Sequence, residues 1–164
     1  MKKKKPLVSI VMGSDSDLPV MKKAADTLDK FDIKFEIKIL SAHRCPEMTA
    51  DFAGSAKDRG IKVIIAGAGG AAHLAGVIAA HTILPVIGVP MDSKLDGMDS
   101  LLSTVQMPAG VPVATVAIGR AGAVNAAILA AQIVGLSDDK MGRRLERYKK
   151  GLVEKVRRKN KKIR

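Results

Sequence analysis

Short aliphatic runs alternate with amphipathic stretches along residues 7–137, and this alternation predicts strands and helices in turn. Strands are expected near five runs: Leu7–Met12, Lys34–Leu40, Lys62–Ala66, Val86–Val89 and Val113–Ile118. Helices are expected near five others: Leu18–Lys30, Pro46–Arg59, Ala71–Ala80, Asp99–Val105 and Ala121–Val134. Because a helix that joins two parallel strands packs on a face of their sheet, this series predicts one parallel sheet covered on both faces.

The number and order of these elements favour a flavodoxin-like three-layer α/β sandwich with a five-stranded parallel sheet. Residues 34–39 alternate polar with apolar side chains, which is typical of a strand at the edge of such a sheet. A chain of 164 residues with 47% hydrophobic residues can build one core. We therefore expect a single α/β domain over residues 1–137, in which residues 1–6 are a basic extension.

Residues 138–164 form a separate basic segment with an amphipathic pattern. Its apolar residues recur at spacings of three and four: Met141, Leu145, Tyr148, Leu152 and Val156. Such a stripe needs a surface to pack on, which could belong to its own domain or to a neighbouring subunit. We expect residues 157–164 to be frayed or disordered.

The formal net charge of +12 belongs to the two ends of the chain. Residues 2–5 are four lysines, and residues 138–164 hold thirteen Lys and Arg against four Asp and Glu, whereas residues 6–137 sum to −1. A typical nucleic-acid-binding domain carries its basic patch on the folded body, and a stacking platform needs more aromatic residues than three Phe and one Tyr. We therefore expect no specific nucleic-acid partner.

Neither a membrane segment nor a disulfide is expected. The longest apolar stretch, residues 114–134, is interrupted by Arg120 and Asn125, and it would need about 20 apolar residues to span a bilayer. The lysines at residues 2–5 resemble the start of a secretory signal, but no continuous apolar run follows them. Cys45 is the single cysteine and excludes an internal disulfide. The sequence predicts a soluble, cytoplasmic protein without a membrane partner.

Three short polar runs carry the candidate chemistry, and each directly follows a predicted strand. They are residues 13–17, 41–44 and 67–73. Because the carboxyl ends of parallel strands meet at one edge of a sheet, the runs can line a single crevice. They would bring together hydroxyls, carboxylates, an arginine and two histidines, without a clear cluster of metal ligands. This set favours a small anionic substrate and proton transfer, with no metal.

The first run, Gly-Ser-Asp-Ser-Asp, precedes a predicted helix, where Ser and Asp commonly cap the first turn. Capping explains one of Ser14, Ser16 and Asp17 but not all three. Unpaired N–H groups at a helix start, together with serine hydroxyls, make a site for a phosphate. Asp17 would repel a phosphate, so we expect its carboxylate to accept hydrogen bonds from ribose hydroxyls.

The second run, Ser41-Ala42-His43-Arg44, precedes Pro46, which is typical of the first turn of a helix. Arg44 offers a planar fork that suits a phosphate. Histidine titrates near neutral pH, so His43 can act as a proton shuttle, although a lone histidine is more often structural. Its position in a loop beside Arg44 favours catalysis.

The third run satisfies the Gly-x-Gly-x-x-Ala form of the dinucleotide-binding fingerprint. It follows the third predicted strand, however, whereas the fingerprint opens the first βα unit and is followed by an acidic residue at the end of the next strand. Small residues at Ala68, Gly69 and Gly70 instead allow backbone N–H groups to approach a carboxylate or CO₂. His73 could point into the same crevice, and His81 is expected to be structural.

Five motifs along residues 7–135 together resemble the N5-carboxyaminoimidazole ribonucleotide mutase family of purine biosynthesis. They are Gly13–Asp17, Ser41–Arg44, Gly67–Leu74, Asp99–Pro108 and Asn125–Ile133. The resemblance implies an isomerase that moves a carboxylate from a nitrogen to C4 of an aminoimidazole ribonucleotide, without a cofactor. It also implies a reaction that needs no metal, biotin or ATP, and a homo-octamer of flavodoxin-like subunits in which the C-terminal helix packs on a neighbour.

The resemblance further assigns roles to positions of this chain. His43 corresponds to the proton-transfer residue, with Ser41 beside it. Ser14, Ser16, Asp17 and Arg44 correspond to the residues that bind the 5′-phosphate and the ribose. The residues that correspond to the enclosure around the imidazole and the migrating carboxylate are Ala68, Gly69, Gly70, His73 and Leu74.

The chain departs from the usual family pattern at Cys45, Ala75 and His81, of which Ala75 has the greatest potential to affect loop closure. A related branch of the family carboxylates aminoimidazole ribonucleotide directly with CO₂, but it usually lacks the Gly-Ala-Gly-Gly-Ala-Ala-His-Leu run found here. Two other classes remain as alternatives. One is a non-enzymatic nucleotide- or flavin-binding module, and the other is a polyanion-binding protein that uses the terminal lysines and arginines.

Overall fold

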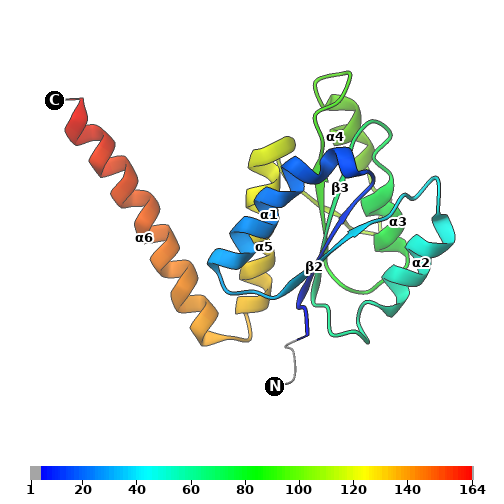
Figure 1. The fold of residues 1–164 in the computed structure, drawn as a ribbon, viewed down its shortest axis with the longest axis horizontal. Coiled ribbons are helices and arrows are strands. Elements are labelled where there is room, and N and C mark those ends of the chain that lie inside the picture. The colour runs from blue at the N-terminus through cyan, green and yellow to red at the C-terminus, as the bar shows by residue number, and fades with distance from the viewer. Residues whose placement is uncertain (1–4, 164) are drawn as a thin grey trace.

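The computed structural model describes residues 5–163, and its centre is a five-stranded parallel sheet (Figure 1). The strands are β1 (Val8–Met12), β2 (Phe35–Ile39), β3 (Val63–Ala68), β4 (Val86–Pro90) and β5 (Ala114–Thr115). They lie in the order β2-β1-β3-β4-β5, and every neighbouring pair is parallel. This order is that of flavodoxin-like sheets and confirms the predicted architecture.

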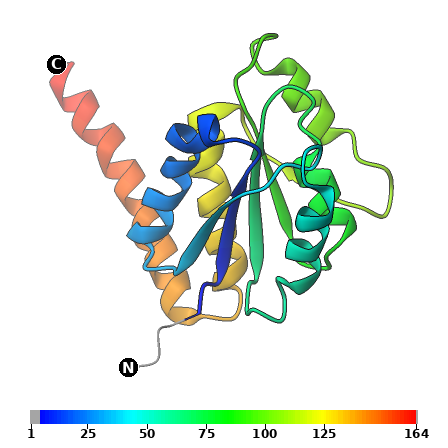
Figure 2. The same cartoon turned by 45° about the vertical axis from the view of Figure 1, so that its right-hand side comes forward.

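Helices cover both faces of the sheet. They are α1 (Leu18–Lys30), α2 (Pro46–Ser55), α3 (Leu74–Ala80), α4 (Met98–Val105), α5 (Gly119–Gly135) and α6 (Asp139–Lys162), with a 3-10 turn, η1 (Asp15–Asp17), ahead of α1. Helices α1 and α5 lie together on one face, and α2 and α3 lie on the other (Figures 1 and 2).

The pleat of the central strands divides the core into two layers. Val8, Ile10 and Met12 of β1 point into the layer below α1 and α5, whereas Val11 points into the layer below α2 and α3. All five residues of β1 and of β4 are buried, as expected for strands that are covered on both faces. The edge position of β2 confirms the prediction from its alternating pattern.

Three boundaries differ from the predictions by three or more residues, and the others agree to within two residues. Helix α3 begins at Leu74 instead of Ala71, because Gly70 adopts a positive φ of 62° and the following residues form the approach to the helix. Helix α2 ends at Ser55, and hydrogen-bonded turns continue to Arg59. Strand β5 spans two residues rather than Val113–Ile118, because only Ile87 and Gly88 of β4 pair with it.

Helix α6 continues to Lys162, so the expectation of fraying is wrong for residues 157–162. Asp138 caps its start, since the Asp138 carboxylate accepts hydrogen bonds from the N–H groups of Lys140 and Met141. Lysines in the last turn stabilise its end through the helix dipole. Residues 1–4 of the expected basic extension, and residue 164, lie outside the described residues.

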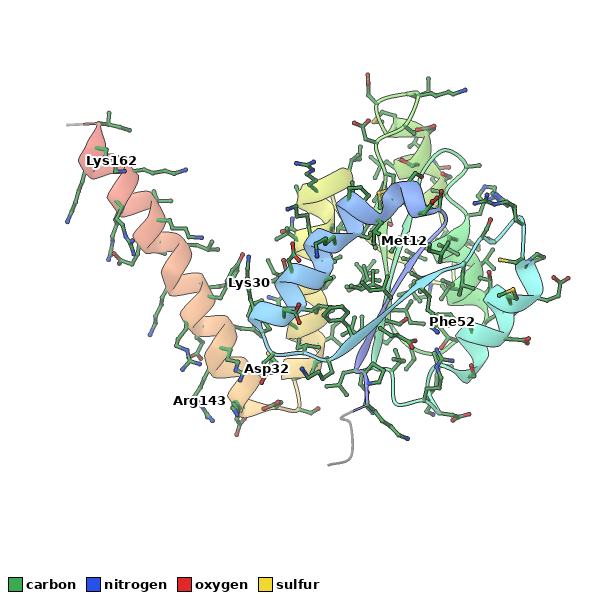
Figure 3. The ribbon with its side chains drawn as sticks, viewed as in Figure 1. Met12, Lys30, Asp32, Phe52, Arg143 and Lys162 are labelled. Carbon is green, nitrogen blue, oxygen red and sulfur yellow. The ribbon has the colours of Figure 1, made fainter. Side chains whose placement is uncertain are left out.

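The first turns of α6 fold back on the domain, and the rest projects away from it (Figures 1 and 3). Tyr148 packs edge-on against Phe31, with ring centroids 5.5 Å apart. Arg144 Nη1 donates to the Phe31 carbonyl, and Arg144 Nη2 lies 3.2 Å from Asp32 Oδ2. Farther along, Leu152 and Val156 are 42% and 58% exposed, so the apolar stripe is covered only over its first half.

Among the described residues, no helix combines the length and apolar character that a membrane crossing requires.

Candidate active site

The three polar runs meet at the carboxyl ends of β1, β2 and β3 and line one cleft of about 410 Å³. This is the edge at which the strand order reverses direction, between β1 and β3, where open α/β sheets bind ligands. Predicted residues that line the cleft are Ser14, Ser16, Asp17, Ser41, His43, Arg44, Ala68, Gly69, His73 and Leu74. Gly70 is the one residue with a predicted role outside this lining, and Gly13, Ala42 and Ala71 of the same runs line the cleft although no role was predicted for them.

The first loop leaves β1 and turns through η1 into α1. Ser14 caps η1, because its Oγ accepts a hydrogen bond from the Ser16 N–H at 3.3 Å. Asp17 precedes α1, and its carboxylate makes no capping hydrogen bond to that helix. Capping therefore accounts for Ser14 alone, whereas Ser16 and Asp17 line the cleft.

Partial burial raises the pKa of the Asp17 carboxyl. Hydrogen bonding to the backbone of Ser14 and to the side chain of Ser16 lowers the same pKa but does not cancel the effect of burial. A carboxylate that has lost part of its hydration is prepared to accept hydrogen bonds from hydroxyl groups of a ligand.

The second loop is tied to the first by Arg44. Its Nη2 donates to the Gly13 carbonyl at 2.8 Å, and its Nε donates to Ser41 Oγ at 3.3 Å. Nη1 makes no hydrogen bond to any residue from 5 to 163, so this edge of the guanidinium is open to an anion. The loop is closed by Cys45, whose Sγ accepts from the Ser41 N–H at 3.2 Å. The sulfur of Cys45 thus takes part in the turn that holds Ser41 and Arg44.

The two histidines predicted for the site contact each other. His43 Nε2 lies 2.8 Å from His73 Nδ1, and the ring centroids are 4.9 Å apart with nearly perpendicular planes. One of the two nitrogens must donate and the other must accept, so a proton is shared along this contact. Both rings are exposed to the cleft, where a reacting ligand can reach them.

The glycines of the third loop are explained by packing and backbone conformation. A Cβ at Gly67 would lie 2.5 Å from both Met21 Sδ and Met91 Cε, so the glycine makes room for the ends of these two methionine side chains. Gly70 needs its positive φ to turn the chain toward α3. The glycine pattern therefore does not require a dinucleotide.

The remaining sequence features lie outside the cleft. His81 is exposed at the end of α3, and Ala75 is buried in the core layer below α2 and α3. Between residues 5 and 163, no group of three or more His, Cys, Asp or Glu side chains is arranged to hold a metal ion.

Sequence reasoning assigned no role to the run Asp99–Pro108, which contains most of α4. In the structure, Ser103 and Thr104 of α4 hydrogen-bond to the backbone of the third loop. The signal in the sequence was the close spacing of three hydroxyl side chains, Ser100, Ser103 and Thr104, which capping and solvation do not explain.

Comparison with known proteins gives a consistent result. The family model described as AIR carboxylase matches residues 7–155. A protein of Pyrococcus horikoshii is 58% identical over 164 residues, which cover 99% of this chain and 92% of that protein. A Bacillus subtilis protein is 58% identical over 152 residues, covering 92% of this chain and 94% of that protein. Both relatives are named N5-carboxyaminoimidazole ribonucleotide mutase.

Solved structures agree in fold as well as in sequence. Treponema denticola PurE superimposes with a TM-score of 0.87 at 30% identity, over 97% of this chain and 99% of that chain. A single-substitution variant of Treponema denticola PurE2 gives a TM-score of 0.89 at 28% identity, over 98% of this chain and 99% of that chain. The match of the family model to nearly the whole chain, together with these relatives, shows that the chain belongs to the AIR carboxylase family.

Proposed function

We propose that this protein is an isomerase of purine biosynthesis that converts N5-carboxyaminoimidazole ribonucleotide to 4-carboxy-5-aminoimidazole ribonucleotide. The observation that carries the proposal is the convergence of His43, Arg44 and the glycine-rich loop on one cleft, in a chain 58% identical over its length to a named mutase. Several other relatives with 55–60% identity carry the same name.

The substrate would lie across the three loops. Ser14, Ser16 and the open edge of Arg44 supply donors for the 5′-phosphate, and Asp17 accepts from the ribose hydroxyls. The imidazole and its carboxylate then lie against the third loop, with Ser41 lining the same cleft. Of the residues that we expect to enclose them, Ala68, Gly69, His73 and Leu74 line the cleft, and Gly70 lies next to this lining in the same loop.

The proposed reaction transfers a carboxyl group with no net uptake or release of a proton. The N–C bond of the carbamate breaks and releases CO₂, and the exocyclic nitrogen gains a proton. C4 of the aminoimidazole then attacks the CO₂, and the C4 proton leaves to restore aromaticity. His43 serves as the acid in the first half and the base in the second, so one residue recovers the proton that it gave. Since CO₂ that escapes is lost, the cleft must stay closed to water during the transfer.

The assembly proposed with this function is a homo-octamer in the cytoplasm. The exposed half of the α6 stripe, at Leu152 and Val156, supports a subunit contact, since an uncovered apolar stripe is a typical interaction surface. Other exposed apolar side chains, such as Ile83 at 82% and Leu95 at 64% exposure, offer further surface for contacts between subunits.

Two assays separate the mutase from direct carboxylation, the alternative to which the description of the family model points. The first supplies N5-carboxyaminoimidazole ribonucleotide without ATP or added bicarbonate and follows ultraviolet absorbance. The second supplies aminoimidazole ribonucleotide with CO₂. Turnover confined to the first supports the mutase. Turnover confined to the second would assign the carboxylase instead, and binding without turnover in either would leave a nucleotide-binding module.

A further inference from the structure

Helix α4 lies behind the third loop of the site, and Ser103 joins the two. Ser103 Oγ accepts a hydrogen bond from the Ala72 N–H at 3.0 Å and lies 3.2 Å from the Gly70 carbonyl oxygen. The hydroxyl has a single proton, which it donates either to the Gly70 carbonyl or to a carbonyl of its own helix, that of Asp99 at 2.6 Å or that of Ser100 at 3.3 Å. The Ser103 side chain thus contacts the backbone of residues 70–72, the segment that leads to His73.

Besides Ser103, one other helix α4 side chain supports this segment among residues 5–163: Thr104 Oγ1 lies 3.5 Å from the Ala72 carbonyl oxygen, a longer contact than that of Ser103. Gly70 has a positive φ, and α3 begins only at Leu74, so Ala72 lies outside the helix and its N–H has no place in the helical ladder. Ala72 is 1% exposed, which leaves its N–H out of reach of bulk water. Without Ser103 this N–H would lose its acceptor, and the backbone one residue before His73 would be free to shift.

Helix α4 is a firm base for this contact. Ser100 Oγ is buried and donates to the Met91 carbonyl at the end of β4. Asp99 Oδ1 accepts from the Ser93 hydroxyl and from the Ser100 N–H, and this hydrogen bonding to Ser93 holds the pKa of Asp99 below its usual range. Gly97 precedes the first turn of α4 and has a φ of 80°. A Cβ at this position would lie 2.6 Å from Ile118 Cγ2, so the start of α4 packs closely on Ile118. The start of α4 is therefore fixed to the sheet, and Ser103 transmits that position to the third loop.

Ser103 does not line the cleft. It lines a separate groove of about 420 Å³ between α3 and α4, and His73 borders both hollows. A role for Ser103 in binding the ligand directly is therefore not supported by its position, whereas a role through His73 is.

We propose that Ser103 is a positioning residue, which holds the Ala72 backbone so that His73 Nδ1 meets His43 Nε2 in the cleft. The inference rests on the proposed function, because it concerns the proton-transfer residue of that reaction. This role would also explain why the run Asp99–Pro108, which supplies no residue to the lining of the cleft, is among the motifs of the family.

The test compares four variants with the wild type: Ser103→Ala, Ser103→Thr, Ser103→Val and Ser55→Ala. Thr and Val have the same shape and differ only in the hydroxyl, so the pair isolates the hydrogen bond. Ser55 is a remote helical serine whose hydroxyl donates to the Asp51 carbonyl, which makes it a matched control. We expect Ser103→Ala and Ser103→Val to lower kcat about tenfold or more with KM within about threefold, and Ser103→Thr and Ser55→Ala to stay near wild type.

A spectroscopic readout separates positioning from a general loss of folded protein. The chain has three histidines, so the ring signals of His43, His73 and His81 can be followed by nuclear magnetic resonance of ¹³C-labelled protein during a pH titration. In the wild type the His43 and His73 signals should respond to each other, as expected from their 2.8 Å contact. In Ser103→Val this mutual response should be lost, while the His81 signal is unchanged.

The two proposals fail separately. A wild type inactive toward N5-carboxyaminoimidazole ribonucleotide would overturn the function, and the resonance experiment would still decide the positioning role. Wild-type kcat in Ser103→Val, equal losses in Ser103→Thr and Ser103→Val, or an undisturbed response between the two histidines would overturn the role of Ser103. If Ser103→Ala does not fold, the comparison of Thr with Val decides alone.

Discussion

The 2.8 Å contact between His43 Nε2 and His73 Nδ1 joins two loops that are 30 residues apart in sequence and leave different strands of the sheet. Two imidazolium rings would present N–H groups to each other at this distance, so the contact requires that at least one ring be neutral. The shared proton therefore lies between the two rings, at the wall of the cleft. A reaction that first gives up and then recovers one proton can use such an arrangement.

Arg44→Lys should weaken substrate binding more than it slows the chemistry. Arg44 reaches Gly13 and Ser41 with two of its nitrogens and leaves a third toward the cleft, and a lysine cannot make these contacts at once. We expect KM to rise about tenfold, which corresponds to about 1.4 kcal/mol, with kcat changed less than about threefold. Steady-state kinetics measure both, and a fall in kcat at unchanged KM would contradict the binding role.

Gly67→Ala should destabilise the fold. The new Cβ would lie 2.5 Å from Met21 Sδ and Met91 Cε, so both side chains must shift within a packed core, at a cost of about 1–3 kcal/mol. Gly142→Ala is the matched control, since a Cβ at this helical position meets no atom within 4 Å. That change should stabilise the protein by about 0.5–1 kcal/mol. Urea unfolding measures both free energies, and equal values for the two variants would refute the packing argument.

Asp17→Asn should raise stability at neutral pH while it impairs function. Burial raises the pKa of Asp17 in the folded state, so the folded protein holds this proton more tightly than the unfolded chain does. The ionised carboxylate therefore costs stability above the pKa of the unfolded chain, and this cost fades as the pH falls and both states become protonated. Asn carries no charge, so its advantage over Asp17 should be largest near neutral pH and shrink as the solution is acidified.

Urea unfolding of Asp17→Asn at several pH values tests this sign. Asp58→Asn, an exposed carboxylate on the surface, controls for the change in net charge. A stability gain from Asp17→Asn that grows on acidification would show that the sign is wrong. The same variant should raise KM, because an amide is a poorer acceptor for ribose hydroxyls than a carboxylate.

Leu152→Asp should dissociate subunits without unfolding them, if the uncovered half of α6 is an assembly surface. Leu152 lies beyond the part of α6 that packs on its own domain, so a charge there disturbs no intramolecular core. Lys150→Asp on the opposite face of the helix is the control. Sedimentation velocity should give smaller particles for Leu152→Asp alone, with an unchanged circular dichroism spectrum. Identical particles for both variants would rule this surface out.

The sequence predicted the sheet, and the meeting of three polar loops at one edge of it, because the pattern there is local and repetitive. Buried strands such as Val8–Met12 are continuous aliphatic runs, and the polar residues that follow them mark the edge at which the loops meet. The β-α-β rule then places these loops together without knowledge of any side-chain contact.

The parts that sequence reasoning missed depend on contacts between distant residues. The start of α3 shifts to Leu74 because Gly70 takes a positive φ and the Ala72 N–H bonds to Ser103, 31 residues away. The persistence of α6 to Lys162 reflects a good N-cap at Asp138 and favourable helix propensities, which outweigh the repulsion among its positive charges. Neither the contact of Ser103 with Ala72 nor the His43–His73 contact follows from a periodic pattern, since each joins one residue to one other.

The central claim is that His43 transfers the proton in the carboxyl shift, and one comparison tests it most directly. Wild type and His43→Asn are given N5-carboxyaminoimidazole ribonucleotide without ATP or added bicarbonate, and product is followed by ultraviolet absorbance while substrate binding is measured by calorimetry. The account predicts turnover by the wild type, and at least about a hundredfold loss of kcat in His43→Asn with binding retained, as is typical when a general acid-base is removed. Turnover by His43→Asn within a few-fold of the wild type would contradict it.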